Sequence, residues 1–281
     1  MTLDRNLVGR EFGPATYSWT SRDTLLYALG VGAGQEDALQ ELAFTTENSD
    51  GTAQQVLPSY AVLLMQNTAR AKLGNIDHTR LVHAGQSFSL ARPLPPQGSV
   101  VVRNQVTGIY DKGSGALVET QATARDATTN EVLAASTSSV FIKGEGGFGG
   151  DRGPSEKHPV PERAPDFDKT FQTRADQALI YRLSGDRNPL HSDPAFAARG
   201  GFDRPILHGM CTYGITARLL LHAFCESDPA RVAGMKARFT KPVLPGDVLR
   251  IQGWREDDAV RFRTLGADGQ PVMDAGFLYL V

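Results

Sequence analysis

The chain has 281 residues, of which 41% are hydrophobic and 21% charged, and its formal net charge is −2. This length can bury a sizeable core in one large domain or two smaller ones, and the composition is ordinary for a globular protein. No basic run indicates nucleic acid binding, and no apolar run is long enough to span a bilayer. We therefore expect a globular protein that engages neither nucleic acid nor a membrane.

Two cysteines, Cys211 and Cys225, fall in or at the end of one predicted helix. Fourteen helical residues would separate them by about 21 Å, which is too far for a disulfide. Unpaired thiols are typical of a reducing compartment, and the first residues lack the apolar core of a signal peptide. The expected location is the cytoplasm.

The first half of the chain predicts helices followed by strands. A short strand around Tyr17 runs into a helix over residues 23–29, which stops at Gly30. The apolar stretch after Pro58 predicts a long buried helix over residues 60–73. Four segments with β-branched residues or alternation then predict strands over residues 83–92, 99–110, 116–126 and 132–142.

Residues 144–165 are rich in glycine and proline and predict a linker. The spacing of Gly144, Gly146 and Gly149 matches the dinucleotide-binding fingerprint. That fingerprint requires a helix directly after it, whereas a proline-rich tract follows here, so we reject a dinucleotide site.

After the linker the same order of elements returns, with a helix over residues 174–183 and a long apolar helix over residues 210–224. Strands are predicted over residues 238–243, 248–255, 260–265 and 272–280. This repetition indicates an α+β fold of two similar units, residues 1–143 and 166–281, joined by the linker.

One short stretch combines Asp186, Asn188 and His191 around Pro189. A residue before proline is disfavoured in the helical region, so Asp186 and His191 can face one another across a bend and hold one water molecule. That arrangement suits general acid–base catalysis. The same residues are also typical of a simple turn, or of metal ligands, although the paired Cys or His residues of a zinc site are missing.

The longer stretch YRLSGDRNPLHSDPAFAARGGFDRPILHGMCTYGITAR, residues 181–218, resembles the signature of the MaoC-like dehydratases. The nearest branch is the enoyl-CoA hydratase 2 group, and residues 27–33, 111–115, 146–150 and 238–242 are also similar to its sequences. The resemblance implies a double hot-dog fold, in which each repeat wraps an antiparallel sheet around a long buried helix. It also implies a hydro-lyase that interconverts trans-2-enoyl-CoA and (3R)-3-hydroxyacyl-CoA.

Four residues are expected to take part in catalysis. The resemblance assigns roles to Asp186 and His191, whereas Gly209 could also be a plain helix start. Asp186 and His191 would share one water and add it in syn fashion, while Asn188 would orient the water or the carboxylate, unless it is only a turn residue. Gly209 begins a predicted helix, and its N–H is expected to donate to the thioester oxygen, because helix N-termini favour negative charge. The adjacent His208 is expected to pack or to orient the loop.

Further residues are expected to bind substrate: His83 and Ala84, which resemble a His-Gly contact pair with alanine in place of glycine, together with Lys112 and Phe239. The first half has no counterpart of the acid–base pair. It would therefore be a non-catalytic acyl-binding half, with one active site per chain. The implied substrate is acyl-CoA, or acyl-carrier protein, and the implied assembly is a homodimer without metal or redox cofactor.

Two other functions fit a hot-dog fold. A thioesterase would direct the water to the carbonyl carbon instead of C3. A non-catalytic acyl-thioester binding protein would have no need for both Asp186 and His191.

Overall fold

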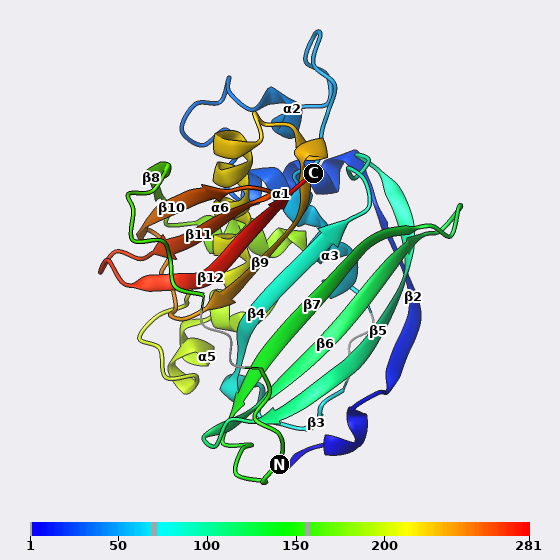
Figure 1. Cartoon of the computed structure of the whole chain (residues 1–281), viewed down its shortest axis with the longest axis vertical. Coiled ribbons are helices and arrows are strands. Elements are labelled where there is room, and N and C mark those ends of the chain that lie inside the picture. The colour runs from blue at the N-terminus through cyan, green and yellow to red at the C-terminus, as the bar shows by residue number, and fades with distance from the viewer. Residues whose placement is uncertain (1, 69–71, 155–157) are drawn as a thin grey trace.

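The computed structural model describes residues 2–68, 72–154 and 158–281 (Figure 1). The first half contains strands β1 Thr2–Leu3, β2 Glu11–Trp19, β3 Gly74–Asn75, β4 Leu81–Leu90, β5 Gly98–Asp111, β6 Gly115–Asp126 and β7 Val132–Lys143. Its helices are α1 Ser21–Gly30, α2 Leu42–Thr45 and α3 Ala61–Gln66, with 3-10 turns at Arg5–Leu7, Pro58–Tyr60 and His78–Arg80.

The second half contains strands β8 Phe167–Gln172, β9 Val232–Phe239, β10 Val248–Glu256, β11 Ala259–Leu265 and β12 Pro271–Leu280. Its helices are α4 Gln177–Tyr181, α5 Pro194–Arg199 and α6 Gly209–Phe224, with 3-10 turns at Arg182–Ser184, Pro189–His191 and Pro229–Arg231.

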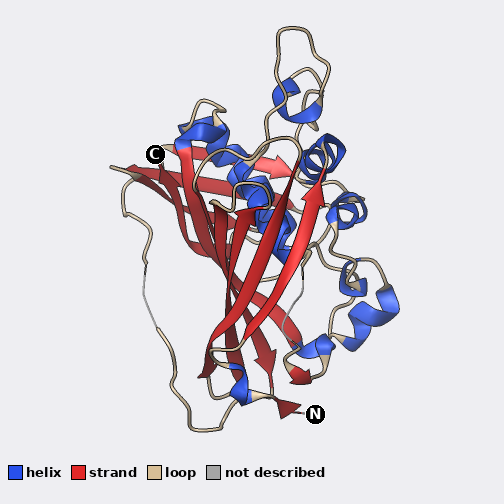
Figure 2. Cartoon of the chain, turned by 90° about the vertical axis from the view of Figure 1, so that its right-hand side faces the viewer, coloured by secondary structure: helices blue, strands red, loops and turns tan. Residues whose placement is uncertain are grey.

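Ten strands form one antiparallel sheet in the order β2-β5-β6-β7-β4-β9-β12-β11-β10-β8, and β1 pairs separately with β3. The two halves join where β4 meets β9, from the pair Gly85 and Arg238 to the pair Ser89 and Gly234. Figure 2 shows most of the helices gathered on one side of this curved sheet. The predicted α+β arrangement of two helix-and-sheet units is confirmed.

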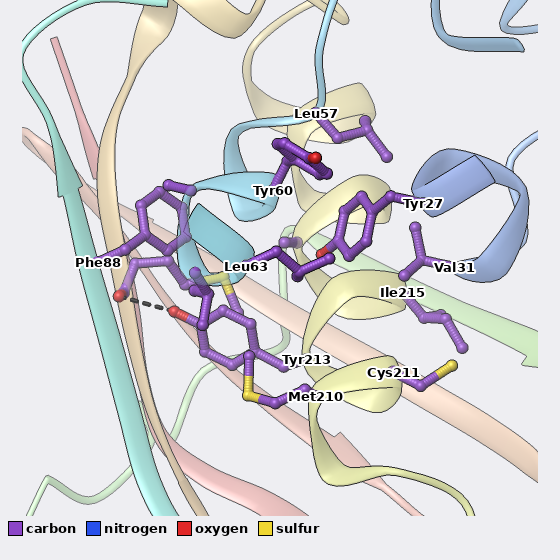
Figure 3. Close-up of a cluster of buried hydrophobic side chains, with 14 of the residues drawn as sticks. Tyr27, Val31, Leu57, Tyr60, Leu63, Phe88, Met210, Cys211, Tyr213 and Ile215 are labelled. Carbon is purple, nitrogen blue, oxygen red and sulfur yellow. Dashed lines mark hydrogen bonds between the residues drawn. The ribbon is translucent and has the colours of Figure 1, made fainter. Parts of the chain in front are cut away.

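Helix α6 lies at the centre of the core and is buried from Met210 to Leu221. The Tyr213 hydroxyl donates to the carbonyl of Met235 at 2.8 Å, which ties the helix to β9 (Figure 3). The rings of Tyr27 and Tyr60 pack edge to face with centroids 5.5 Å apart. Three helices from both halves, α1, α3 and α6, therefore share one apolar cluster.

The long helix predicted over residues 60–73 is wrong. Helix α3 ends at Gln66, and the Thr68 hydroxyl donates back to the Met65 carbonyl at 2.7 Å. Asn67 and Thr68 have short polar side chains that compete with the backbone for hydrogen bonds, which disfavours continuation of a helix. The remainder of that prediction falls partly on residues 69–71, outside the described residues.

Two predictions in the second half need correction, and one strand was not predicted. Strand β9 spans residues 232–239 instead of 238–243, because Pro242 lacks a ladder donor. Strand β8 was not predicted, since its residues are mostly polar and it lies at the edge of the sheet. The helix expected over residues 174–183 is the short α4 followed by a 3-10 turn.

The glycine-rich start of the linker is fastened to the β5–β6 turn. The Asp111 carboxylate accepts hydrogen bonds from the amides of Gly113, Gly147 and Gly149 at 2.7–2.8 Å. These bonds hold the pKa of Asp111 at about 2. Two amides of the segment 144–149, which resembles the dinucleotide fingerprint, thus bind a carboxylate of the chain itself. This segment is a structural loop.

No helix in the part of the chain that the structure describes combines the length and apolar character needed to cross a membrane.

Candidate active site

The signature stretch forms a series of tight turns between α4 and α5. Gly185 follows the 3-10 turn Arg182–Ser184 with φ of 130°, a conformation that L side chains rarely adopt. Asn188 then begins the 3-10 turn Pro189–His191, as its position before proline predicts. These turns bring Asp186 and His191 to the same side of the loop.

His191 is buried and has a fixed tautomer. Its Nδ1 lies 2.9 Å from the carbonyl oxygen of Ile206. A carbonyl only accepts, so Nδ1 carries the proton and Nε2 keeps a free lone pair in the neutral ring. Burial lowers the pKa of His191 below its usual value, against the smaller opposing effects of the Ile206 bond and Asp186. The ring is therefore a base at neutral pH.

Asp186, His191 and His208 form a compact cluster. Each offers one ligand atom, and these atoms all lie within 4.8 Å of one another. Two hydrogen bonds of about 2.8 Å each span up to about 5.6 Å, so one water molecule can contact Asp186 and His191 together. The predicted approach of these two residues is thus present in the fold.

His208 stacks on His191 with ring centroids 3.7 Å apart and an interplanar angle of 28°. Its Nε2 donates to the main-chain oxygen of Asp186 at 3.3 Å, while its buried Nδ1 has no partner among the described residues. Burial is the main cause that holds the pKa of His208 well below its usual range, and the neighbouring His191 lowers that pKa further. His208 therefore orients the loop as a neutral ring.

The stacking also bears on the metal alternative. Imidazole lone pairs lie in the ring plane, and the planes of His191 and His208 run side by side at 3.7 Å. Lone pairs that lie in two nearly parallel, stacked planes do not readily converge on one ion, as tetrahedral coordination requires. The cluster is better suited to proton transfer than to metal binding.

Asn188 is exposed, and its contacts are those of a turn residue. Its Oδ1 accepts a hydrogen bond from the main-chain N–H of Leu190 at 3.0 Å. Its main-chain N–H donates to Oδ1 of Asp186 at 3.1 Å. These bonds account for its side-chain oxygen within the turn. They favour the turn interpretation over direct orientation of the water.

Gly209 begins α6 directly after His208. The amides of Cys211 and Thr212 bond to the His208 carbonyl, whereas no acceptor among the described residues occupies the N–H of Gly209. A Cβ at Gly209 would lie 3.3 Å from the ring of Phe239, so the helix end faces that ring closely. The expected donor is therefore free at the expected helix terminus.

Phe239 also reaches the first half of the chain. Its ring centroid lies 5.0 Å from that of His83, whose Nε2 lies 3.2 Å from the Ser138 hydroxyl. Three of the predicted residues, His83, Phe239 and Gly209, are thus brought together across the junction of β4 and β9. Ala84 follows at a register shift of β4 and is half-buried.

Lys112 lies apart from this group, on the turn between β5 and β6. Its Nζ donates to the carbonyl of Arg152 and lies 5.9 Å from the ring centroid of Tyr110. Among the described residues, no hydrogen bond or ion pair connects Lys112 with the cluster around His191. Its predicted contact with substrate stays a prediction.

Asn67 was not predicted as a site residue. Its side-chain amide donates to the carbonyl of Ser184 at 3.1 Å, across 117 positions of sequence. No local pattern announces such a contact, because Asn67 follows an apolar helix in the other half of the chain.

Family models match both halves of the chain. Residues 17–144 match the MFE-2 hydratase 2 N-terminal domain, and residues 156–274 match the MaoC like domain. The chain is 46% identical to 3-hydroxyacyl-thioester dehydratase Y of Mycobacterium tuberculosis over 98% of both chains. It is 41% identical to enoyl-CoA hydratase ChsH3 of the same organism over 91% of both chains.

A solved MaoC-like dehydratase from Phytophthora capsici superposes with a TM-score of 0.86 and 32% identity, over 100% of this chain and 98% of that one. The chain therefore belongs to the MaoC-like dehydratase family, in its enoyl-CoA hydratase 2 branch. It is accordingly a hydro-lyase, and its fold is the double hot dog.

Proposed function

We propose that the protein catalyses reversible syn hydration of trans-2-enoyl-CoA to (3R)-3-hydroxyacyl-CoA. The observation that carries this proposal is the placement of Asp186 and His191 within reach of a single water, with Nε2 of His191 free to accept a proton. Its relatives include proteins named enoyl-CoA hydratase and 3-hydroxyacyl-thioester dehydratase.

In the proposed reaction, Asp186 and His191 carry out the proton transfers to and from one water molecule. One group takes a proton from the water as its oxygen bonds to C3, and the other delivers a proton to C2 on the same face of the double bond. Such acid–base catalysis contributes about 10²–10⁴-fold in rate. The products are a hydroxyl group at C3 and a new C–H bond at C2, with no change in the thioester.

The thioester oxygen gains negative charge as water adds, and we assign its stabilisation to the N–H of Gly209. The free donor at the N-terminus of the sixteen-residue helix α6 supports this role. One such donor contributes roughly 10²–10³-fold in rate.

The first half is proposed as a non-catalytic acyl-binding half. Its helix α3 has six residues against sixteen in α6, and His83 from β4 lies against Phe239 near the catalytic cluster. A short helix leaves more of the sheet's inner face available to an acyl chain. Ala84 and Lys112 are proposed to contact the CoA portion.

The proposed reaction changes no oxidation state, and Asp186 with His191 supplies the proton transfers, so we propose that no metal or redox cofactor takes part. A homodimer in the cytoplasm is also proposed, in keeping with the buried, unpaired thiols of Cys211 and Cys225. Light scattering after size exclusion measures the assembly directly.

Stereochemistry tests the proposal most sharply. Crotonyl-CoA hydrated in D₂O should give (3R)-3-hydroxybutyryl-CoA with one deuterium at C2, on the face that also received the hydroxyl. Coupled (R)- and (S)-specific dehydrogenases identify the C3 centre, and proton coupling constants identify the C2 centre. A (3S) product, or anti placement of the deuterium, would refute the proposed mechanism.

A further inference from the structure

The turn that carries Asp186 is held from its own half of the chain by three contacts. The Gly185 amide donates to the Arg182 carbonyl at 3.2 Å. His208 binds the main-chain oxygen of Asp186, and the main-chain N–H of Asn188 donates to the Asp186 carboxylate. Arg182 and Asn188 lie in the same loop and can move together with it, whereas His208 directly precedes the buried helix α6.

The turn is also held from the first half, by Asn67. The Asn67 Nδ2 donates to the Ser184 carbonyl at 3.1 Å and lies 3.5 Å from the Tyr17 hydroxyl. A carbonyl oxygen only accepts hydrogen bonds, so the NH₂ side of the amide must face Ser184. The orientation of the Asn67 side chain is thereby fixed.

Asn67 also covers the residue directly before Asp186. A Cβ placed on Gly185 would lie 2.4 Å from Oδ1 and 2.6 Å from Nδ2 of Asn67. The side chain therefore packs flat against the backbone of Gly185, whose φ of 130° already requires glycine. Hydrogen bond and packing act on two consecutive residues of the catalytic turn.

Asn67 lies at the end of a buried helix, α3. It caps the C-terminus of α3, where its main-chain N–H donates to the Leu63 carbonyl at 3.1 Å. Residues Ala61 to Met65 of this helix are fully buried in the shared core. A site residue held by such a support keeps its geometry better than one held only by loops.

We infer that Asn67 is a positioning residue for the hydration reaction: it fixes the Ser184–Asp186 turn so that the Asp186 carboxylate faces the water shared with His191. This inference rests on the proposed function. It assigns the first half a part in catalysis beyond acyl binding, because the acid–base loop is set against α3.

The expected effect is on turnover more than on binding. Misplacement of a catalytic group by about 1 Å can cost about 10²-fold in rate. We expect Asn67→Ala to lower kcat for crotonyl-CoA hydration about 10- to 100-fold, with KM within about threefold of wild type. Asn67→Asp, of nearly the same shape, should lose as much, because a carboxylate oxygen would then oppose the Ser184 carbonyl.

Tyr17→Phe is the matched control. It removes the weaker partner of the Asn67 amide and leaves the bond to Ser184 in place. Its kcat should stay within about twofold of wild type. Thermal unfolding of every variant identifies those that fail to fold, and Asn67→Asp serves as the test if Asn67→Ala does not fold.

The outcomes separate the inference from the proposed function. If wild type does not hydrate crotonyl-CoA or longer enoyl-CoA substrates, the proposed function fails. If wild type is active and the folded Asn67 variants keep its kcat, the positioning role is wrong. A rise in KM at constant kcat would instead make Asn67 a substrate-binding residue and would equally overturn the inference.

Discussion

At the scale of single residues, the buried imidazole of His191 predicts how the proposed hydration responds to pH. Its Nδ1–H is committed to the Ile206 carbonyl, and burial lowers its pKa below the usual 6.5. A lowered pKa keeps the ring neutral and basic throughout the neutral range. Protonation of His191 removes the base that the proposed hydration needs.

We therefore predict that kcat/KM for hydration is constant from neutral pH down to 6.5 and falls only at lower pH. Because kcat/KM reports the free enzyme, the midpoint of the fall measures the pKa in the unliganded site. Initial rates with crotonyl-CoA in a constant-ionic-strength buffer series supply the profile. A midpoint above 6.5 would contradict the environment described for His191.

The turn role of Asn188 gives a prediction that distinguishes capping from catalysis. Its Oδ1 accepts from the Leu190 amide at 3.0 Å, which a serine hydroxyl can also do. We expect Asn188→Ser to keep a hydration rate within a few-fold of wild type. Asn188→Ala should lose more of both its rate and its stability. Loss of a capping side chain costs about 0.5–2 kcal/mol.

Steady-state rates and urea unfolding of both variants provide the measurement. A catalytic amide would show itself by an equally large fall in kcat for the serine and alanine variants.

Among the secondary-structure elements, α6 is joined to the loop between α1 and α2 by a buried ion pair. Glu41 accepts from Nη1 of Arg218 at 2.7 and 2.9 Å and contacts Nε2 of His222 at 2.6 Å. Burial alone would raise the pKa of Glu41, but His222 and Arg218 outweigh it and lower the pKa to about 2. The Arg218 side chain is only 3% exposed.

We predict that Glu41→Gln destabilises the protein by about 3–5 kcal/mol, because Arg218 would remain as a buried charge without its counter-ion. The matched control is Glu36→Gln, which removes the exposed pair with Lys169 at 2.6 Å and should cost at most about 1 kcal/mol. Urea unfolding at pH 7 compares the two. Equal small losses would refute the structural role of the buried pair.

The same carboxylate predicts an acid dependence. A pKa lowered from 4.5 to about 2 contributes stability that is fully present above pH 4.5 and is lost as pH falls through 2. Glu41→Gln should therefore lose less stability than wild type between pH 5 and pH 3.

Most strands of the first half could be predicted from sequence, since alternation and turn residues mark them clearly. Strand β9 could not, because Ala233 and Gly234 are poor strand formers, and the strand is specified by its neighbours β4 and β12. The long helix after Pro58 was predicted from apolar character alone, which does not reveal that Asn67 and Thr68 end it.

Some contacts of the candidate site could likewise be predicted from the sequence, and others could not. Asp186 and His191 lie five positions apart in one loop, so their approach was predictable from that stretch. The contact between His83 and Phe239 depends on the pairing of β4 with β9, and the Asn67 contact depends on the docking of α3. These contacts join distant parts of the chain, and sequence spacing carries no information about them.

The continuous sheet makes a prediction for the molecule as a whole. Trp19 on β2 and Trp254 on β10 are both buried and lie in different halves. Because β4 and β9 join the halves and α1, α3 and α6 share one core, we expect a single cooperative unfolding transition. The single-tryptophan variants Trp254→Phe and Trp19→Phe each report on one half by fluorescence.

Their urea transitions should superimpose after correction for any shared loss of stability. Midpoints that differ between the two probes would indicate that the halves unfold independently and that the sheet junction contributes little.

In the proposed function, Asp186 and His191 add water to C3 of an enoyl thioester. The direct measurement follows the absorbance of crotonyl-CoA on mixing with the protein, with a thiol reagent in a parallel sample. We predict loss of enoyl absorbance without release of thiol, and a fall of orders of magnitude in rate for Asp186→Asn and for His191→Ala. Thiol release by wild type, or unchanged rates in both variants, would contradict the account.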